Sequence, residues 1–440
     1  IGKISSLLLD IIKIKMETSD FDFENLASIF DKVVSENISD EKYKEILVAY
    51  SGGIDSTALL YLANKFSKKH NKNIKAIHVN HNINIKSKNW ENHCQVFCNN
   101  HNIPLIIRSI NIDIKPGQSM EEIARQERYK AINLNSSQHT LLMTGHHIDD
   151  QVETFFYNLL RGSGTKGLSA MPILKENLKG FHIRPILSFN KTALIDLVKQ
   201  LKFDYIHDDS NENMNFSRNY IREKILPEIK KKWPNYNKMV DRAILNLTNA
   251  QKLCSDLALI DLKKYKIQNK DNIISINVRD LDDNRFNNVI RYWIEKNSFK
   301  MPSHQQIDSI KKNVFHAGMD KNPIFSCSSF EIRRHKEHLE IMSPLKKHDP
   351  HAIYKWKKNE NLVISGLAIN LSWKNLEEKL GYKVDDDVEV KFRKEGENIK
   401  INDRKSLKDY MREQNIPPWK RDRVMLIYIK DELKVIWNKV

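Results

Sequence analysis

The sequence predicts an α/β fold: a doubly wound parallel sheet in the first half, followed by a helical domain and a small α+β C-terminal domain. Short apolar segments of strand length alternate with helical patterns up to about residue 225, as in parallel sheets with crossover helices. A glycine-rich turn joins the first strand to its helix. Because 440 residues exceed what one core usually holds, we expect an extension at 1–16, domains at 17–225, 226–345 and 353–440, and a linker at 346–352.

The charge of the chain is uneven and indicates a polyanionic partner. The net charge is +16, with 27 Lys and Arg against 25 Asp and Glu in residues 1–220, and 45 against 31 in residues 221–440. A front half that is nearly neutral and a basic rear half are typical of an enzyme that meets a phosphate backbone. The competing interpretation is a lysine-rich composition spread over solvated surfaces.

The remaining composition excludes several classes of protein. Four cysteines in 440 residues make no disulfide framework, and no Cys-x-x-Cys motif is present for zinc or an iron–sulfur cluster. The longest apolar runs are short and interrupted by charge, so we expect no membrane span. The N-terminal run lacks a secretory cleavage pattern. We therefore expect a cytoplasmic protein.

The first strand and its turn form the motif around which the chain is organised. The strand Ile46–Ala49 is followed by Ser51-Gly52-Gly53-Ile54-Asp55-Ser56 and by a helical pattern from Ala58. Glycines let backbone N–H groups approach an anion, and Ser56 is expected to cap the helix. No lysine follows as in a Walker loop, and Asp55 fits a phosphate site best as a Mg²⁺ ligand. The alternative is a capped turn that binds nothing.

Further elements follow in βα order. The second strand, Ile74–His81, places Asn80 and His81 at the edge of the sheet where ligands bind, whereas His78 is expected to be buried and satisfied. Ser119 and Glu122 form a capping-box pattern that opens a helix. The other predicted elements are a polar helix within 17–45, a helix at Trp90–His101, and strands at Pro104–Ile107, His139–Thr144 and Arg184–Leu187.

Acidic and histidine residues gather after the fourth strand, in Gly145-His146-His147-Ile148-Asp149-Asp150-Gln151-Val152-Glu153. Asp150 and Glu153 share one helix face and repel each other unless a cation lies between them. That cation could be Mg²⁺ or a substrate amine. A metal site made by His146, His147 and Asp149 is a weaker alternative, because Mg²⁺ prefers oxygen ligands.

Basic residues follow this region in the chain. Arg161 and Gly162 belong to a second glycine-rich loop, Leu159–Leu168, which we interpret as a lid. Arg218 and Arg222 precede a helix that is expected to stop near Pro227. Helices are also predicted at Tyr236–Lys264, Arg285–Asn297 and Ser303–Asn313, and strands near Phe325–Phe330 and His338–Met342.

The last ninety residues are expected to form short strands and one helix. They carry cations interleaved with an aromatic residue, which suits contact with RNA phosphates and unstacked bases. An ordinary small domain with a basic surface is the alternative. The candidate RNA contacts there are Lys391, Arg393, Trp419, Arg421 and Arg423.

These motifs together resemble the tRNA(Ile)-lysidine synthase family within the PP-loop ATPases. The resemblance rests on the Ser51 loop, His78–His81, Glu122–Arg125, the string from Gly145 to Thr154, Arg161–Gly164, Asp209–Asn211, Arg218–Arg222, Ile416–Trp419 and Arg421–Arg423. It covers the catalytic part almost wholly and the final domain well. It implies an adenine nucleotide alpha hydrolase-like PP-loop domain, followed by two tRNA-binding domains.

The resemblance also implies a reaction and roles for its residues. ATP would adenylate the anticodon wobble cytidine of a tRNA(Ile) with a CAU anticodon, and L-lysine would then displace AMP from C2. The cofactors would be ATP and Mg²⁺. A homodimer is compatible with the sequence, which does not fix the oligomeric state. The implied catalytic residues are Asp55, Asp150 and Arg218, and the implied metal ligands are Asp55 and Asp149. The implied lysine site consists of Asp150, Glu153 and Arg218. ATP would be bound by Ser51 to Ser56, Asn80, His81, Gly145, His146, Arg161 and Gly162, and tRNA by Arg222, Lys391, Arg393, Trp419, Arg421 and Arg423.

Two rival functions remain open at this point. A tRNA thiolase shares the loop but needs a cysteine nucleophile or cluster ligands, and Cys94 and Cys98 are poorly placed for either role. A non-catalytic RNA-binding module would explain the charge, but not the acidic residues between Asp149 and Glu153.

Overall fold

The protein is described by a computed structural model that covers residues 23–82, 86–110, 120–177, 179–207, 214, 216–267, 270–318, 321–367, 369–393, 400–401 and 405–438. The expected extension at 1–16, the Ser119 cap and the polar loop 209–211 lie outside these residues. The chain forms two compact units that divide between Lys252 and Leu253. This boundary falls within helix α11 (Tyr236–Tyr265). The finer domain limits given above therefore stay predictions.

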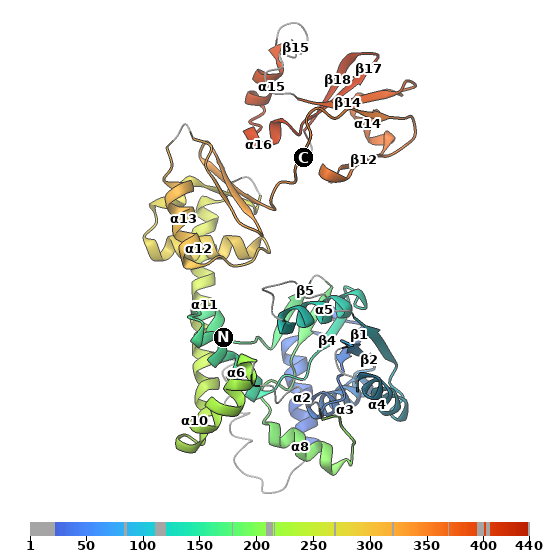
Figure 1. Ribbon diagram of the computed structural model, residues 1–440, viewed down its shortest axis with the longest axis vertical. Coiled ribbons are helices and arrows are strands. Elements are labelled where there is room, and N and C mark those ends of the chain that lie inside the picture. The colour runs from blue at the N-terminus through green and yellow to red at the C-terminus, as the bar shows by residue number, and fades with distance from the viewer. Residues whose placement is uncertain are drawn as a thin grey trace. The chain divides into compact units, whose positions relative to one another are not determined.

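A six-stranded sheet organises the first unit (Figure 1). Its order is β3-β2-β1-β4-β6-β5, and all neighbouring pairs are parallel except β5 with β6. Such a sheet needs helices on both faces, which confirms the predicted doubly wound architecture. The strands are β1 (Glu45–Ala49), β2 (Asn73–Asn80), β3 (Leu105–Ser109), β4 (Thr140–Met143), β5 (Leu174–Asn177) and β6 (Gly180–Ile183).

Helices cover the two faces of this sheet unequally. On one face the core joins α2 (Phe23–Asn37), α3 (Ile54–Lys69), α4 (Ser87–Asn100) and α8 (Lys191–Gln200) through residues such as Phe30, Leu59 and Leu197. On the other face α5 (Met120–Leu134) packs Ile132 against Leu47, Ile77 and Leu142. The larger core therefore packs against both β1 and α3, and it fixes the positions of the strand and the helix that the glycine-rich turn connects.

A smaller helical cluster completes the unit around Val152, Ile221 and Leu226. It joins α6 (Ile148–Leu160) to α9 (Ser217–Tyr220), to the wide π-type turn Ile221–Ile225 and to α10 (Leu226–Lys232). The short helix α7 (Thr165–Leu168) follows α6. None of the helices in the described part of the chain combines the length and apolarity that a membrane crossing needs.

Two local expectations in this unit are wrong. The segment from Arg184 to Leu187 is not a strand, because β6 ends at Ile183 and the chain then turns through the bond from Leu187 N–H to the Arg184 carbonyl. The helix also continues past Pro227 to Lys232. Proline sits in the first turn of α10, just after the π-type turn, and there its missing N–H is tolerated.

The second unit holds two small antiparallel sheets. The first, ordered β7-β10-β9-β8, packs with α12 (Asp283–Lys296) and α13 (His304–Ile310) around Trp293, Phe286 and Phe330. Strand β10 confirms the predicted segment His338–Met342. Of the predicted segment Phe325–Phe330 only the first two residues lie in a strand, β8, and the rest form the turn before β9. The strands are β7 (Ile273–Ser275), β8 (Ile324–Ser326), β9 (Glu331–His335) and β10 (His338–Met342).

The second sheet has the order β11-β14-β17-β18. Helix α14 (Trp373–Leu380) packs on one side of it, and α15 (Leu407–Glu413) is held by a separate cluster that includes Met411 and Leu426. With α16 (Pro418–Arg421) the described residues hold three helices where one was predicted, because each is only one or two turns long. The strands are β11 (Tyr354–Trp356), β14 (Val388–Phe392), β17 (Met425–Ile429) and β18 (Glu432–Trp437); short pairs are β12 (Leu362–Ile364) with β13 (Ile369–Leu371) and β15 (Lys400–Ile401) with β16 (Lys405–Ser406).

Candidate active site

The turn after β1 is built to leave backbone N–H groups open. Gly52 has φ +85°, a conformation that strains residues with a side chain. Gly53 then caps α3 without any side-chain hydrogen bond. The first turn of a helix has N–H groups with no intrahelical partner, and its dipole favours anions. The predicted anion cradle therefore lies at the N-terminus of α3.

Ser56 has a different role from the predicted cap. The helix begins two residues before it, at Ile54, because Gly52 and Gly53 already complete the turn. The Ser56 hydroxyl donates to the Gly53 carbonyl at 2.9 Å and lies 3.1 Å from the Ser51 hydroxyl. Ser56 is buried, whereas Ser51 is exposed. Ser56 thus braces the turn from inside, and Ser51 presents the accessible hydroxyl.

A second helix N-terminus adjoins the first. A Cβ on Gly145 would lie 3.2 Å from the Asp55 carbonyl oxygen, so glycine permits close approach of the loop before α6 to the start of α3. His147 caps α6 by accepting the Asp149 N–H at its Nδ1, and Asp150 Oδ2 accepts the His147 N–H at 2.9 Å. Two helix N-termini therefore face the same region, and both favour negative charge.

His147 links the carboxylates of the two helices. Its Nε2 lies 3.7 Å from Asp55 Oδ2 and 3.5 Å from Asp150 Oδ2. Burial alone would lower the pKa of His147, but the interaction with Asp55 and the neighbouring carboxylate charges outweigh it and raise the pKa. Since Nδ1 is an acceptor, the neutral ring carries its proton on Nε2, between Asp55 and Asp150. His147, which the sequence assigned only to a weaker metal site, is the residue that holds them together.

Asp150 and Glu153 do share a cation, and it belongs to the protein. Arg222 donates from Nε and Nη2 to the two Glu153 oxygens at 2.6 and 2.7 Å, and its Nη2 lies 3.9 Å from Asp150 Oδ1. Glu153 is buried, and burial raises its pKa although Arg222 opposes the shift. Arg222, which was predicted to contact tRNA, therefore neutralises Glu153 here.

Two further predicted residues meet at one aromatic ring. The guanidinium carbons of Arg161 and Arg218 lie 5.1 and 5.6 Å from the centroid of the Tyr157 ring, and Arg161 also donates to the Tyr157 hydroxyl. Cation–π contacts hold guanidinium groups in place without neutralising them. Tyr157, which carries no motif signal, thus brings the lid residue Arg161 to Arg218. Gly162 follows with φ +70°.

The remaining nucleotide candidates are held by structural contacts. Asn80 donates to Glu91 at 2.8 Å and accepts from the Asn82 N–H. His78 Nδ1 lies 3.0 Å from the Tyr50 carbonyl oxygen, so the prediction of a buried, satisfied histidine is confirmed. Burial and the charge of Arg128 lower the pKa of His81 to about 4. His146 bonds to Thr144 at 2.9 Å, and burial and Arg184 hold its pKa well below the usual range.

The carboxylates fit Mg²⁺ that arrives with a phosphate ligand. Asp55 Oδ1 is buried without a hydrogen-bond partner among the described residues, and Asp149 Oδ1 accepts from Asn237 at 2.7 Å. No group of three or more His, Cys, Asp or Glu within the described ranges forms a complete metal cage. Mg²⁺ is commonly bound by one or two carboxylates plus substrate phosphates, and Asp55 with Asp149 supplies that donor set.

The cysteines of the first unit are not available for chemistry. Cys94 and Cys98 are fully buried in the core, and burial raises the pKa of each thiol to about 12. A thiolate nucleophile needs a lowered pKa and access. Neither residue supports the chemistry of a thiolase.

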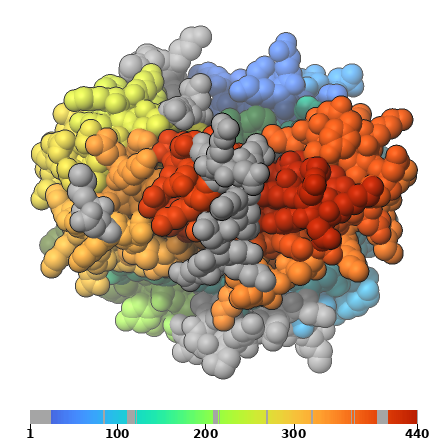
Figure 2. Space-filling view, turned by 90° about the horizontal axis from the view of Figure 1, so that it is seen from above, coloured from blue at the N-terminus to red at the C-terminus, as the bar shows by residue number. Residues whose placement is uncertain are grey.

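The predicted RNA contacts of the second unit pack largely within it. Trp419 lies between Arg333, 5.6 Å from its ring, and His335, at 6.1 Å between ring centroids. Arg423 is buried and donates to the Lys346 carbonyl. In Figure 2 the red-orange segment of α15 and α16 lies beside orange residues of the preceding sheet. The other contacts are Lys391 with Glu389 and the Tyr428 ring, Arg393 with Met411, and Arg421 with the Ile416 carbonyl.

Comparison with known proteins covers nearly the whole chain. Three family models match it: the PP-loop domain at residues 25–229, the TilS substrate binding domain at 277–340 and the TilS substrate C-terminal domain at 388–438. The tRNA(Ile)-lysidine synthase of Coxiella burnetii is 35% identical over 88% of this chain and 87% of its own length. The enzymes of that name from Buchnera aphidicola subsp. Acyrthosiphon pisum and Legionella pneumophila (strain Lens) are 34% and 32% identical over about 90% of each chain.

Proposed function

The chain belongs to the tRNA(Ile)-lysidine synthase family, and we propose on this premise that it joins L-lysine to the anticodon wobble cytidine of a tRNA(Ile) with a CAU anticodon. ATP drives the reaction, as the PP-loop domain implies. In the first step the cytidine O2 attacks the α-phosphate of ATP and pyrophosphate leaves. In the second step the lysine amine attacks C2, AMP leaves and the amine loses a proton.

The first step uses the two helix N-termini. We assign the phosphates to the turn from Ser51 to Ser56 and to the loop at Gly145 and His146, with Asn80, His81, Arg161 and Gly162 completing the ATP site. The supporting observation is the close approach of Gly145 to Asp55, which puts two positive helix ends at one place. Mg²⁺, held by Asp55 and Asp149, would neutralise phosphate charge when bound. Preorganised N–H groups and positioning supply the rest of the catalysis.

The second step needs a bound, neutral amine. We assign lysine to Asp150, Glu153 and Arg218, where the bidentate guanidinium of Arg218 suits the substrate carboxylate. Arg222 donates to both Glu153 oxygens and so fixes the position of that side chain. We assign removal of the amine proton to the carboxylate of Asp150 in the same site. The tRNA is held by the basic rear half, with Lys391, Arg393 and Arg421 as candidate contacts and Trp419 and Arg423 shaping that surface.

The test is one assay with purified full-length protein, ATP, Mg²⁺, labelled lysine and a tRNA(Ile) transcript with a CAU anticodon. Label on the tRNA together with an equal amount of AMP supports the proposal. Asp55→Asn should abolish both products, whereas Asp196→Asn, an exposed aspartate of α8, should not. Formation of AMP without labelled tRNA would mean that the nucleophile or the acceptor is not the proposed one. The absence of AMP would favour a non-catalytic RNA-binding module.

Two proposals on cellular context accompany this function. The enzyme would act in the cytoplasm, where its tRNA substrate is located, and fractionation of cells would test that placement. A homodimer is compatible with the sequence, which does not fix the oligomeric state, and sedimentation of the purified protein would decide between a dimer and a monomer.

A further inference from the structure

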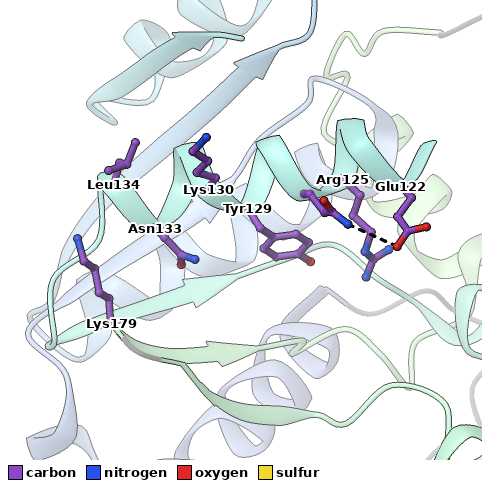
Figure 3. A pocket seen from close by; sticks show the side chains of 8 residues that line it. Glu122, Arg125, Tyr129, Lys130, Asn133, Leu134 and Lys179 are labelled. Atoms are coloured by element: carbon purple, nitrogen blue, oxygen red, sulfur yellow. Dashed lines mark hydrogen bonds between the residues drawn. The ribbon is translucent and has the colours of Figure 1, made fainter. Parts of the chain in front are cut away.

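A groove runs along α5 in the first unit (Figure 3). Its volume is about 610 Å³, and its lining residues come from α5 and from Lys179, in the turn between β5 and β6. Glu122 and Arg125 lie at one end, Tyr129 and Lys130 in the middle, and Asn133 near Lys179 at the other end. None of these residues has a role in the proposed ATP or lysine sites.

The charge of this groove is strongly one-sided. Three cations, Arg125, Lys130 and Lys179, line it, and Glu122 is the single acid among its described lining residues. Glu122 accepts a hydrogen bond from Gln126 at 3.4 Å. Lys130 lies 3.4 Å from Glu127, but this pair is exposed, and such pairs contribute little. The groove therefore has spare positive charge for an anion.

A buried cation behind the groove, Arg184, adds to its positive potential. The Arg125 guanidinium lies 5.6 Å from the centroid of the Tyr129 ring, which in turn lies 5.8 Å from the ring of His182. Arg184 is 5% exposed, and its Nε has no hydrogen-bond partner among the described residues. Burial first, and then the charges of Arg184 and Arg125, lower the pKa of His182 to about 3 and keep it neutral. The positive potential behind the groove therefore comes from the guanidinium groups of Arg125 and Arg184, because His182 is neutral.

The length of the groove fits a run of nucleotides. Residues 122 to 134 of α5 span about 18 Å at 1.5 Å per residue. A stacked nucleic-acid strand carries one phosphate per 3.4 Å, so about five phosphates correspond to that length. The groove lies near the catalytic region, because the Tyr129 ring contacts His182, and the hydroxyl of Thr144 lies 2.8 Å from His182 Nε2 and 2.9 Å from His146 Nδ1 in the loop before α6. A strand in the groove would lead toward the helix N-termini of the active site.

We propose that the α5 groove binds the sugar–phosphate backbone of the RNA substrate, with Arg125, Lys130 and Lys179 contacting phosphates along its length. The proposal rests on the function given above, because it takes the substrate to be RNA. It adds an RNA contact surface within residues 1–220, which are nearly neutral in net charge, whereas the charge distribution along the chain points only to residues 221–440 as an RNA-binding region.

The experiment compares two double charge reversals in the full-length protein. Lys130→Glu/Lys179→Glu alters the groove, and Lys68→Glu/Lys199→Glu alters two exposed lysines of α3 and α8, which cover the opposite face of the sheet. Affinity for the tRNA(Ile) transcript is measured by filter binding at several salt concentrations. Thermal unfolding and ATP binding show whether each variant is folded, and Lys130→Gln/Lys179→Gln replaces the groove variant if it is not.

We expect the groove variant to bind the transcript about tenfold or more weakly near physiological salt. Its plot of log affinity against log salt should be shallower by about 1.4 to 1.8, the value for two lost phosphate contacts. The control pair should change neither quantity. Equal effects of both pairs, or no effect of the groove pair, would overturn the proposal. Tight transcript binding by the unaltered protein without lysine incorporation would instead refute the proposed function, and the groove would still be judged by the binding data.

Discussion

Replacing Arg222 tests how much the ion pair between Arg222 and Glu153 contributes to the free energy of unfolding of the first unit. Arg222 makes two hydrogen bonds to Glu153, which is 4% exposed, while the Arg222 side chain is 32% exposed. Removing one partner of a fully buried pair destabilises by about 3 to 5 kcal/mol, because the other charge stays buried. Because Arg222 is partly exposed, the loss of stability should be smaller, and we expect Arg222→Met to lower the free energy of unfolding by about 2 to 3 kcal/mol.

The assay is thermal unfolding of the full-length protein followed as a function of pH. For a unit of this size each kcal/mol shifts Tm by about 2 to 4 °C, so Arg222→Met should unfold roughly 4 to 12 °C lower at pH 7. Burial already raises the pKa of Glu153, and loss of Arg222 raises it further. A group whose folded pKa is raised stabilises most when protonated, so the deficit should shrink as the pH falls toward the unfolded value of 4.5.

Two matched variants complete this test. Lys224→Met, which removes an exposed cation two residues from Arg222, should leave Tm almost unchanged. Glu153→Gln in combination with Arg222→Met should recover much of the loss, since no charge is then buried. A deficit that is the same at pH 5 and pH 8, or a Lys224→Met variant as unstable as Arg222→Met, would refute the assignment of Arg222 to Glu153.

Three other predictions concern separate parts of the structure. Gly52→Ala places a side chain at φ +85° and 2.3 Å from Ile206 Cδ1, so ATP binding measured by calorimetry should fall sharply, with about 1 to 2 kcal/mol of lost stability; wild-type affinity would contradict the strained turn. His182 should make the protein about 2 kcal/mol less stable at pH 5 than above pH 6.5, because its pKa falls to about 3 on folding; His182→Gln should flatten that slope in urea titrations. Lys420 and Glu340, 2.7 Å apart, should show a coupling of about 1 kcal/mol in a double-mutant cycle on the second unit, and additive effects would argue against this contact.

Much of the first unit follows from local signals. The central strands β1 and β4 are apolar runs whose consecutive residues are buried, as expected for strands covered on both faces. The turn at Gly52 and Gly53 was recognisable because only glycine combines a positive φ with close backbone approach. The prediction that the helix stops near Pro227 was wrong, because a local signal, the proline, competes there with the packing of the helix. Pro227 follows a π-type turn and lies in the first turn of α10.

The candidate site was predictable in its residue types but not in its pairings. Spacing alone placed Asp150 and Glu153 on one helix face and required a cation between them. That the cation is Arg222, about seventy residues away in the chain, depends on the packing of α6 against α9 and the π-type turn. Tyr157 and Asn237 gave no sequence signal, since an aromatic or amide residue on a helix is usually core or surface.

The sequence by itself determined the fold class, the family and the chemical character of the site, because period, glycine position and charge are local properties of the chain. Only the tertiary structure decided which distant groups contact one another: Glu153 with Arg222, Trp419 with Arg333 and His335, and His147 with Asp55 and Asp150. The physical reason is that these interactions join residues far apart in sequence. Their distances are set by how helices pack on the sheet, which no single segment encodes.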